Sequence, residues 1–148
     1  MRWVWLVLRL ALAGVFVYAA YTKLRQPWLL FAMSIDSYGL LPQWAVLAVA
    51  RTLPWLELLL GLLLASGFGL RWVALATSLQ LGVFLSVMLR AWFKGQGIDC
   101  GCFGAGEALS WKTLVRDGAL AAGAVALTIS AFRARKPLKL PLPKVDMP

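Results

Sequence analysis

The two cysteines of the chain, Cys100 and Cys102, are separated by a single glycine within the glycine-rich segment Gly95–Gly106. A bridge between cysteines at this spacing requires a sharp backbone turn, and Gly101 removes the Cβ atom that would oppose it. A disulfide that closes so small a ring is strained, constrains almost none of the chain and is easily reduced. The spacing therefore indicates reactive thiol–disulfide chemistry rather than a structural bridge.

Charged residues near the pair bear on its reactivity. Ser110 is a candidate N-cap for a following helix, whose positive end would favour a thiolate together with Lys94 and Lys112. Asp99 would oppose the thiolate. We expect the pair to be exposed in its loop; the alternative is two incidental, inert loop cysteines. The chain has no histidine, which excludes haem or zinc sites built on histidine, and a tetrahedral thiolate site would need a second chain.

The elements that position this loop are predicted by hydropathy. The chain has 148 residues, of which 61% are hydrophobic, and its mean hydropathy is +0.79. A soluble domain of this size could not bury so much apolar surface. A helix needs roughly 20 apolar residues to cross the hydrocarbon core, and four segments are long enough: Trp3–Tyr21, Trp44–Ala65, Trp72–Phe93 and Trp111–Phe132.

The predicted fold is an all-α membrane protein: a four-transmembrane-helix bundle with a short interfacial helix after the first span. That short helix covers about Pro27–Met33, with the proline in its first turn. The first span resembles a secretory signal peptide. It is long enough to cross the membrane, however, and is interrupted by Arg9, so we expect that it is not cleaved. We assign residues 1–132 to the membrane domain and residues 133–148 to a basic, proline-rich cytoplasmic tail.

The basic residues indicate orientation. The net charge is +9, but the positive residues flank the apolar segments and do not form the patterned patch of a nucleic-acid binder. Four crossings place both termini on one side, and the basic tail favours the cytoplasm for them. We therefore expect a bacterial inner-membrane protein whose cysteine loop faces outward, on the side that permits disulfides.

Polar side chains inside the predicted spans form a second cluster. Arg9 and Glu57 both lie about 10 Å from the cytoplasmic face by helix rise, so we expect them to pair, with Gln80 at a similar depth. Arg51 lies nearer the outer face, where it is expected to meet Asp117. Two interpretations of the cluster remain open: structural pairing within the bundle, or a path for protons or quinone.

Four motifs together resemble the MauE/DoxX family of small redox-associated membrane proteins, and the MauE branch most closely. The resemblance covers about Val7 to Arg133, and its most specific element is the cysteine motif. In chain order the motifs are Lys23-Leu24-x-x-Pro27, Tyr38-Gly39-Leu40-Leu41-Pro42, Leu53-Pro54-Trp55-Leu56-Glu57 and Cys100-Gly101-Cys102-Phe103-Gly104.

The resemblance implies a role in electron or disulfide traffic across the membrane. In that family MauE is tied to methylamine utilisation and to disulfide formation in the small subunit of methylamine dehydrogenase. DoxX-type relatives are linked to sulfur oxidation with quinone. Carried onto this chain, the resemblance makes Cys100 and Cys102 the redox pair. Its candidate supporting residues are Lys23, Tyr38, Arg51 and Glu57.

Three hypotheses follow. The first is a membrane thiol–disulfide oxidoreductase component that exchanges with a thiol-bearing partner protein through its redox-active disulfide. Quinone would reoxidise the pair near Tyr38 or Arg51. The second is a non-catalytic accessory subunit of a larger membrane complex, with passive cysteines. The third, a small transporter, has neither a repeat nor a clearly broken helix pair to support it.

Overall fold

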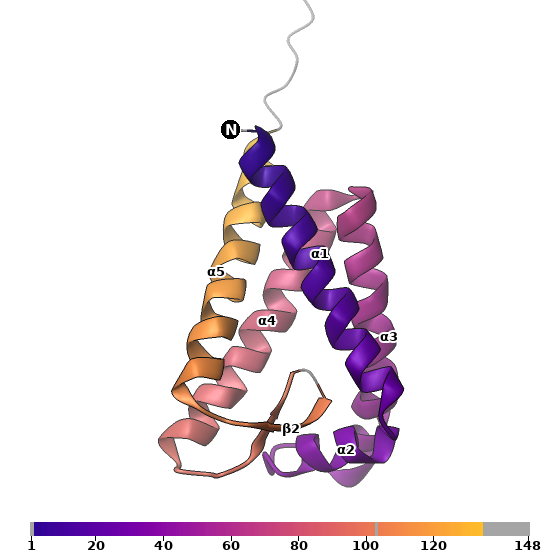
Figure 1. The fold of residues 1–148 in the computed structure, drawn as a ribbon, viewed down its shortest axis with the longest axis vertical. Coiled ribbons are helices and arrows are strands. Elements are labelled where there is room, and N and C mark those ends of the chain that lie inside the picture. The colour runs from indigo at the N-terminus through magenta and orange to yellow at the C-terminus, as the bar shows by residue number, and fades with distance from the viewer. Residues whose placement is uncertain (1, 103, 135–148) are drawn as a thin grey trace, which may run out of the picture.

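A computed structural model describes residues 2–102 and 104–134. These residues form helices, with one small two-stranded hairpin between the last two of them (Figure 1). In chain order the elements are α1 (Arg2–Arg25), α2 (Trp28–Asp36), α3 (Gln43–Ser66), α4 (Leu70–Phe93), β1 (Asp99–Gly101), β2 (Gly104–Ala108) and α5 (Trp111–Arg133).

The helices α1, α3, α4 and α5 are long and apolar enough to cross a membrane. Each has 23 or 24 residues, and their most apolar windows have mean hydropathies between 1.4 and 1.9. This confirms the predicted four-helix membrane fold. The ends of the helices lie within a few residues of the predicted ones, with one consequential difference: α1 continues past Tyr21 to Arg25 and so includes Lys23. The predicted tail lies outside the described residues from position 135 onward.

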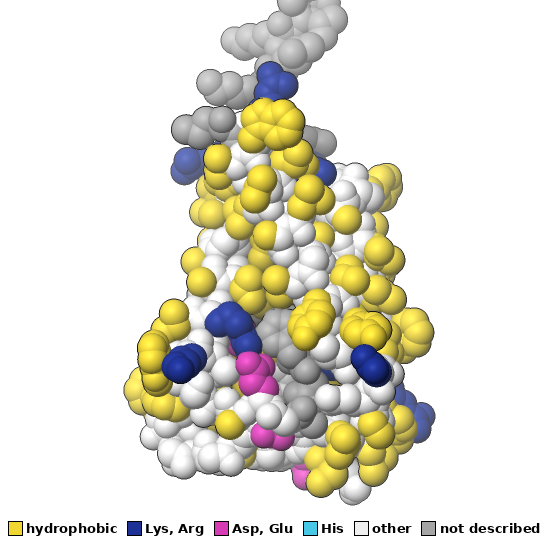
Figure 2. All heavy atoms as spheres, in the orientation of Figure 1, with side chains coloured by type: hydrophobic (Ala, Val, Ile, Leu, Met, Phe, Trp, Pro, Cys, Tyr) yellow, Lys and Arg dark blue, Asp and Glu magenta, His cyan; other side chains and the backbone are white. Residues whose placement is uncertain are grey.

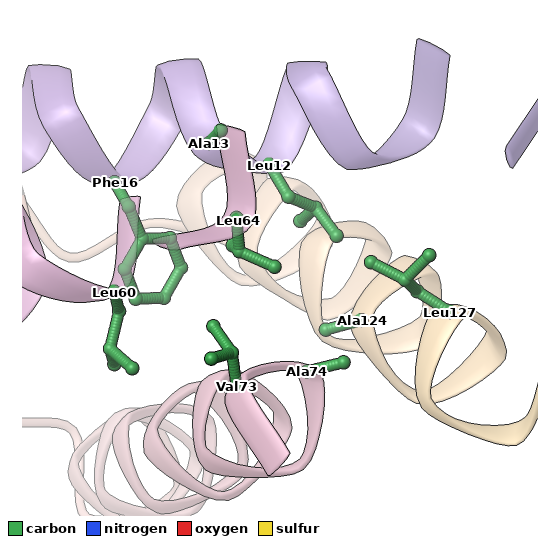
Figure 3. Close-up of a cluster of buried hydrophobic side chains, with 9 residues drawn as sticks. All are labelled: Leu12, Ala13, Phe16, Leu60, Leu64, Val73, Ala74, Ala124 and Leu127. Atoms are coloured by element: carbon green, nitrogen blue, oxygen red, sulfur yellow. The ribbon is translucent and has the colours of Figure 1, made fainter. Parts of the chain in front are cut away.

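Two helix pairs build the bundle: α1 packs along α3, and α4 packs along α5 (Figure 1). Buried side chains from all four helices meet between the pairs (Figure 3), and they are Leu12, Ala13, Phe16, Leu60, Leu64, Val73, Ala74, Ala124 and Leu127. Many large apolar side chains stay exposed on the outer surface. Figure 2 shows them along the length of the helices, whereas acidic side chains appear on that face only at the hairpin end. Such a surface suits a lipid environment.

The two ends of the bundle differ. The start of α1 and the end of α5 lie together at one end, and α2 and the hairpin close the other (Figure 1). The helix α2 confirms the predicted short helix after the first span. Its residues Phe31 and Ala32 are buried against Val46 and Ala50 of α3. The cysteine motif thus lies at the end of the bundle opposite the start of the chain.

The hairpin was not predicted from the sequence. The strands β1 and β2 pair antiparallel, with Asp99 opposite Ala108 and Gly101 opposite Gly104. Gly101 has φ +73°, and a Cβ atom there would lie 3.5 Å from Ser34 Cβ on α2. The glycine therefore permits both the left-handed backbone and the close approach to α2. As a result the segment expected to be an exposed loop folds against the bundle.

Gly61 lies where α3 approaches α1 closely, which gives a stability prediction. A Cβ at Gly61 would lie 2.8 Å from Val17 Cγ2 and 3.1 Å from the carbonyl oxygen of Ala13. Gly61→Val should therefore lower the free energy of unfolding by about 1–3 kcal/mol through overpacking, measured by thermal denaturation in detergent. The control is Gly14→Val on α1, because a Cβ at Gly14 has no neighbour within 4 Å. Equal melting temperatures for the two variants would contradict this packing.

Candidate functional site

The two cysteines are free thiols with unequal exposure. Cys100 is completely buried and Cys102 is partly exposed. The expectation of an exposed pair was therefore wrong for Cys100. The reason is the hairpin, which turns the motif inward so that both strands pack on α2 and β2 also packs on α1. Phe103 lies outside the described residues.

Each thiol lies beside its own carboxylate. Cys100 Sγ is 3.4 Å from Glu107 Oε2 on β2. Cys102 Sγ is 3.2 Å from Asp117 Oδ2 on α5 and 3.6 Å from Met88 Sδ on α4. A carboxylate at this distance accepts a hydrogen bond from a thiol and can take up its proton. The arrangement thus supplies a separate proton acceptor for each sulfur.

Arg116 joins the two carboxylates. Its Nη1 pairs with Glu107 Oε1, and its Nε lies 3.0 Å from Asp117 Oδ1. Its Nη2 is also 4.0 Å from Cys100 Sγ. Since Lys94 and Lys112 are exposed, Arg116 supplies the positive charge that the sequence had attributed to them. The N-cap prediction is confirmed, because the Ser110 side chain accepts a hydrogen bond from the Thr113 amide.

The pKa values of the two thiols are driven apart. Hydrogen bonding from Cys102 lowers the pKa of Cys100, although burial and the nearby Glu107 carboxylate act in the opposite direction. Hydrogen bonding to Cys100 raises the pKa of Cys102, and burial and Asp117 add to the effect. The first proton therefore leaves Cys100, and Cys102 stays protonated as the donor.

Two residues named by the resemblance hold the backbone of the cysteine motif. The Tyr38 hydroxyl, between α2 and α3, donates to the carbonyl oxygen of Cys100 at 2.9 Å. Burial, followed by the nearby thiols, raises the pKa of Tyr38 above its usual value, so the hydroxyl keeps the proton that it donates. The Lys23 ammonium donates to the carbonyl oxygen of Cys102. Both carbonyl groups of the pair are thus fixed from outside the hairpin.

Lys23 also forms a buried ion pair with Glu57. Its Nζ lies 2.7 Å and 2.8 Å from the two carboxylate oxygens, and the side chains are 0% and 6% exposed. Gln80 Nε2 donates to the same carboxylate at 3.3 Å, as its predicted depth suggested. Buried charges are retained where they are paired and hydrogen-bonded. The ammonium therefore links α1, α3 and the cysteine hairpin.

The predicted Arg9–Glu57 pair is wrong. Arg9 Nη1 instead lies against Gly67 in the turn between α3 and α4. The depths estimated from helix rise assumed that the ends of α1 and α3 are level. The start of α1 instead extends beyond the turn between α3 and α4 (Figure 1). Arg9 is therefore level with the turn rather than with Glu57.

The predicted Arg51–Asp117 contact is also wrong. The Arg51 guanidinium stacks on Trp28 of α2, 4.4 Å from the ring centroid, whereas Asp117 pairs with Arg116. Asp99 closes the hairpin, because its Oδ2 accepts from the Gly106 amide at 3.2 Å. Both Arg51 and Asp99 thus contact groups other than the sulfurs.

Sequence reasoning missed Glu107 and the role of the Arg116–Asp117 pair. A signal existed for the pair, since charges in the first turns of a membrane-spanning helix need partners. For Glu107 the sequence contained no comparable signal, because this side chain lies beside Cys100 only when the hairpin forms.

A small cavity connects Cys102 to the ion pair. It has a volume of about 30 Å³ and is lined by Cys102, Asp117, Glu57 and Gln80 together with apolar side chains. A space of this size holds about one or two water molecules. Among the described residues, no group of three or more histidine, cysteine or acidic side chains could hold a metal ion.

Comparison with known proteins identifies a family. A family model described as "Methylamine utilisation protein MauE" matches residues 1–130, which include both cysteines, their carboxylates and the ion pair. No curated protein and no solved structure matches the chain.

The ion pair predicts a pattern of stability changes. Lys23→Met or Glu57→Leu alone strands a buried charge and should cost about 3–5 kcal/mol of unfolding free energy, whereas the double variant should recover much of that loss. Arg9→Met is the control, since Arg9 does not contact Glu57. Thermal denaturation in detergent measures all four variants. A double variant less stable than both singles, or an Arg9→Met loss equal to that of Lys23→Met, would contradict the pairing.

The thiol pair predicts a shift in reactivity with pH. Cys102→Ala removes the hydrogen-bond donor that lowers the pKa of Cys100. Alkylation of Cys100 should then reach half its maximal rate at a higher pH than in the unmodified protein. Mass spectrometry after brief treatment with a small uncharged thiol reagent separates the two sites. A profile unchanged by the substitution would show that Cys102 does not support the Cys100 thiolate.

Proposed function

Because the chain belongs to the MauE family, a family of methylamine-utilisation membrane proteins, we propose that it is a thiol–disulfide oxidoreductase component of the inner membrane. Cys100 and Cys102 are the exchanging pair, and their substrate is a thiol-bearing partner protein outside the cytoplasm. One observation carries the proposal: adjacent thiols each face a carboxylate, at 3.4 Å and 3.2 Å, and a single arginine joins the two carboxylates.

The unequal exposure of the two cysteines suggests their roles. Cys102 is the partly exposed residue of the pair, so the oxidised pair is attacked there by a thiolate of the partner. The bond between Cys100 and Cys102 breaks, and Cys100 leaves as a thiolate. Exchange is faster when the leaving thiol has a low pKa, and the pKa of Cys100 is the lowered one. The geometry thus favours electron flow from the partner into the pair.

The second step of the exchange releases the oxidised partner and completes the transfer of electrons and protons. A second partner thiolate attacks the partner sulfur of the mixed disulfide, which forms the partner's disulfide and releases Cys102 as a thiolate. The partner loses two electrons and two protons, and the pair gains them. Asp117 and Glu107 relay the protons to Cys102 and Cys100, while Arg116 balances the carboxylate charges. The family resemblance suggests the small subunit of methylamine dehydrogenase as the partner.

The proposed orientation places the termini in the cytoplasm. The start of α1 and the end of α5 lie at the end of the bundle opposite the hairpin (Figure 1), and the basic tail follows α5. Basic segments beside a span are retained on the cytoplasmic side. The thiols then face the compartment in which disulfides form.

Reporter fusions test this orientation. Alkaline phosphatase should be active when fused after Gly97, next to the hairpin, and inactive when fused after Pro148, because the enzyme needs an oxidising compartment. A reporter that is active only in the cytoplasm, fused at the same positions, is the matched control and should give the opposite pattern. Phosphatase activity from the Pro148 fusion would contradict the orientation.

Single cysteine variants test the redox role. Cys100→Ser and Cys102→Ser should each lose disulfide formation in the partner as fully as the double variant, since exchange needs both sulfurs. With the oxidised partner supplied, the Cys102 thiolate of Cys100→Ser should attack the partner's disulfide, forming a mixed disulfide and releasing a partner thiolate, which alkylation then blocks. The buried Cys100 of Cys102→Ser should form far less of this adduct. Non-reducing electrophoresis and mass spectrometry of the adducts measure both. If the double variant supports normal partner oxidation, the accessory-subunit hypothesis replaces this one.

A further inference from the structure

A groove lies at the end of the bundle opposite the hairpin, where the start of α1 meets the start of α4 and the end of α5. It has a volume of about 470 Å³. Residues from all three helices line it, among them Arg2, Leu6 and Arg9 of α1, Leu70 of α4, and Leu127 and Ser130 of α5. The groove therefore combines apolar walls with two positive charges.

Arg9 carries a charge that the described part of the chain leaves unpaired. Its Nη1 lies against Gly67, which holds the guanidinium at the level of the turn between α3 and α4. Its Nε is buried and has no hydrogen-bond partner among the described residues, and none of the ion pairs formed there includes Arg9. A guanidinium in a membrane-spanning helix is costly without a partner. The groove thus contains hydrogen-bond donors that lack an acceptor.

The charges at this end of the bundle have one sign. Arg71 lies in the first turn of α4, and Arg133 ends α5. The acidic side chains of the described chain lie elsewhere, in α2, the middle of α3, the hairpin and the start of α5. Figure 2 shows lysine and arginine side chains at the end where α1 starts, and acidic ones on that face only at the hairpin end. The described chain therefore supplies no carboxylate to the groove.

We propose that this groove binds one anionic phospholipid. Its phosphate pairs with Arg9 and Arg2, and its glycerol and first acyl carbons contact Leu6, Leu70 and Leu127. Phosphate oxygens accept hydrogen bonds, and the planar guanidinium fork binds two of them at once. A zwitterionic phospholipid would bring its own cation into a site that is already positive, whereas an anionic one does not.

The position of the groove along the bundle fits a lipid headgroup. Arg9 is level with the turn that ends α3, and headgroup phosphates lie at the ends of the membrane-spanning segments. In the proposed orientation this end meets the cytoplasmic leaflet, whose anionic lipids attract basic residues beside a span. The site lies at the opposite end of the bundle from the thiols, so the lipid is a binding partner separate from the exchange.

The binding test uses native mass spectrometry of the delipidated full-length protein in a neutral detergent. The unmodified protein should bind one phosphatidylglycerol with a Kd at least about tenfold below that for phosphatidylcholine with the same acyl chains. Arg9→Gln should raise the phosphatidylglycerol Kd by about tenfold and leave the phosphatidylcholine Kd unchanged. The matched control is Arg25→Gln, which removes the same charge from the other end of α1 and should bind both lipids normally.

A filled variant tests the groove without changing its charge. Ala131→Phe places a ring in the groove from α5 and should weaken phosphatidylglycerol binding by about tenfold, because the occupied volume is lost. Ala122→Phe, at an exposed position on the same helix, should bind normally. Thermal denaturation without lipid checks that each variant is folded. Added phosphatidylglycerol should raise the Tm of the unmodified protein and both controls, but not that of Arg9→Gln or Ala131→Phe.

Several results would overturn the lipid site. These are equal affinity for the two lipids, a loss in Arg25→Gln as large as that in Arg9→Gln, or unchanged binding in both Arg9→Gln and Ala131→Phe. Displacement of the lipid by inorganic phosphate at an equal concentration would show that the groove takes a free anion, which would also overturn the lipid as its occupant. The Cys100→Ser/Cys102→Ser variant should bind phosphatidylglycerol normally, since the thiols lie outside the groove.

Discussion

A lysine ammonium buried at the end of α1 contacts three parts of the chain at once. Lys23 Nζ donates to both carboxylate oxygens of Glu57 on α3 and to the Cys102 carbonyl of the hairpin. A charge desolvated to this degree is stable only while all of its partners stay in place. The position of the cysteine motif is therefore coupled to the packing of α1 on α3, and the short hairpin does not have to hold the motif alone.

The hairpin in turn determines the electrostatics of the sulfurs. Antiparallel pairing brings Glu107 back beside Cys100, while the start of α5 presents Arg116 and Asp117 to the same space. The arginine reduces the repulsion that two carboxylates would exert on a forming thiolate. Both the lowered pKa of one thiol and the raised pKa of the other thus depend on where a short, glycine-rich hairpin is placed.

The sequence predicted the helices well and the contacts between them poorly, for separable reasons. Span-length apolar runs such as Trp72–Phe93 give a membrane helix directly, because the bilayer thickness sets their length. The strand Gly104–Ala108 lacks the alternation of apolar and polar residues that indicates a strand, so the sequence did not predict the hairpin. The partner of Glu57 was missed because helix rise gives depth only along one helix, whereas the axial offset of α1 against α3 depends on how the two helices pack. The cysteine pair and Lys23 came from local motifs, which need no such offset.

In the proposed exchange, the inward turn of the hairpin would restrict which thiols reach the pair. Cys100 is fully buried and Cys102 only partly exposed, so a bulky, charged thiol such as glutathione would approach Cys102 less readily than a cysteine on an extended or unfolded segment. The enclosure would then favour clients that are still folding, and the timing of a client's own folding would limit when it is oxidised.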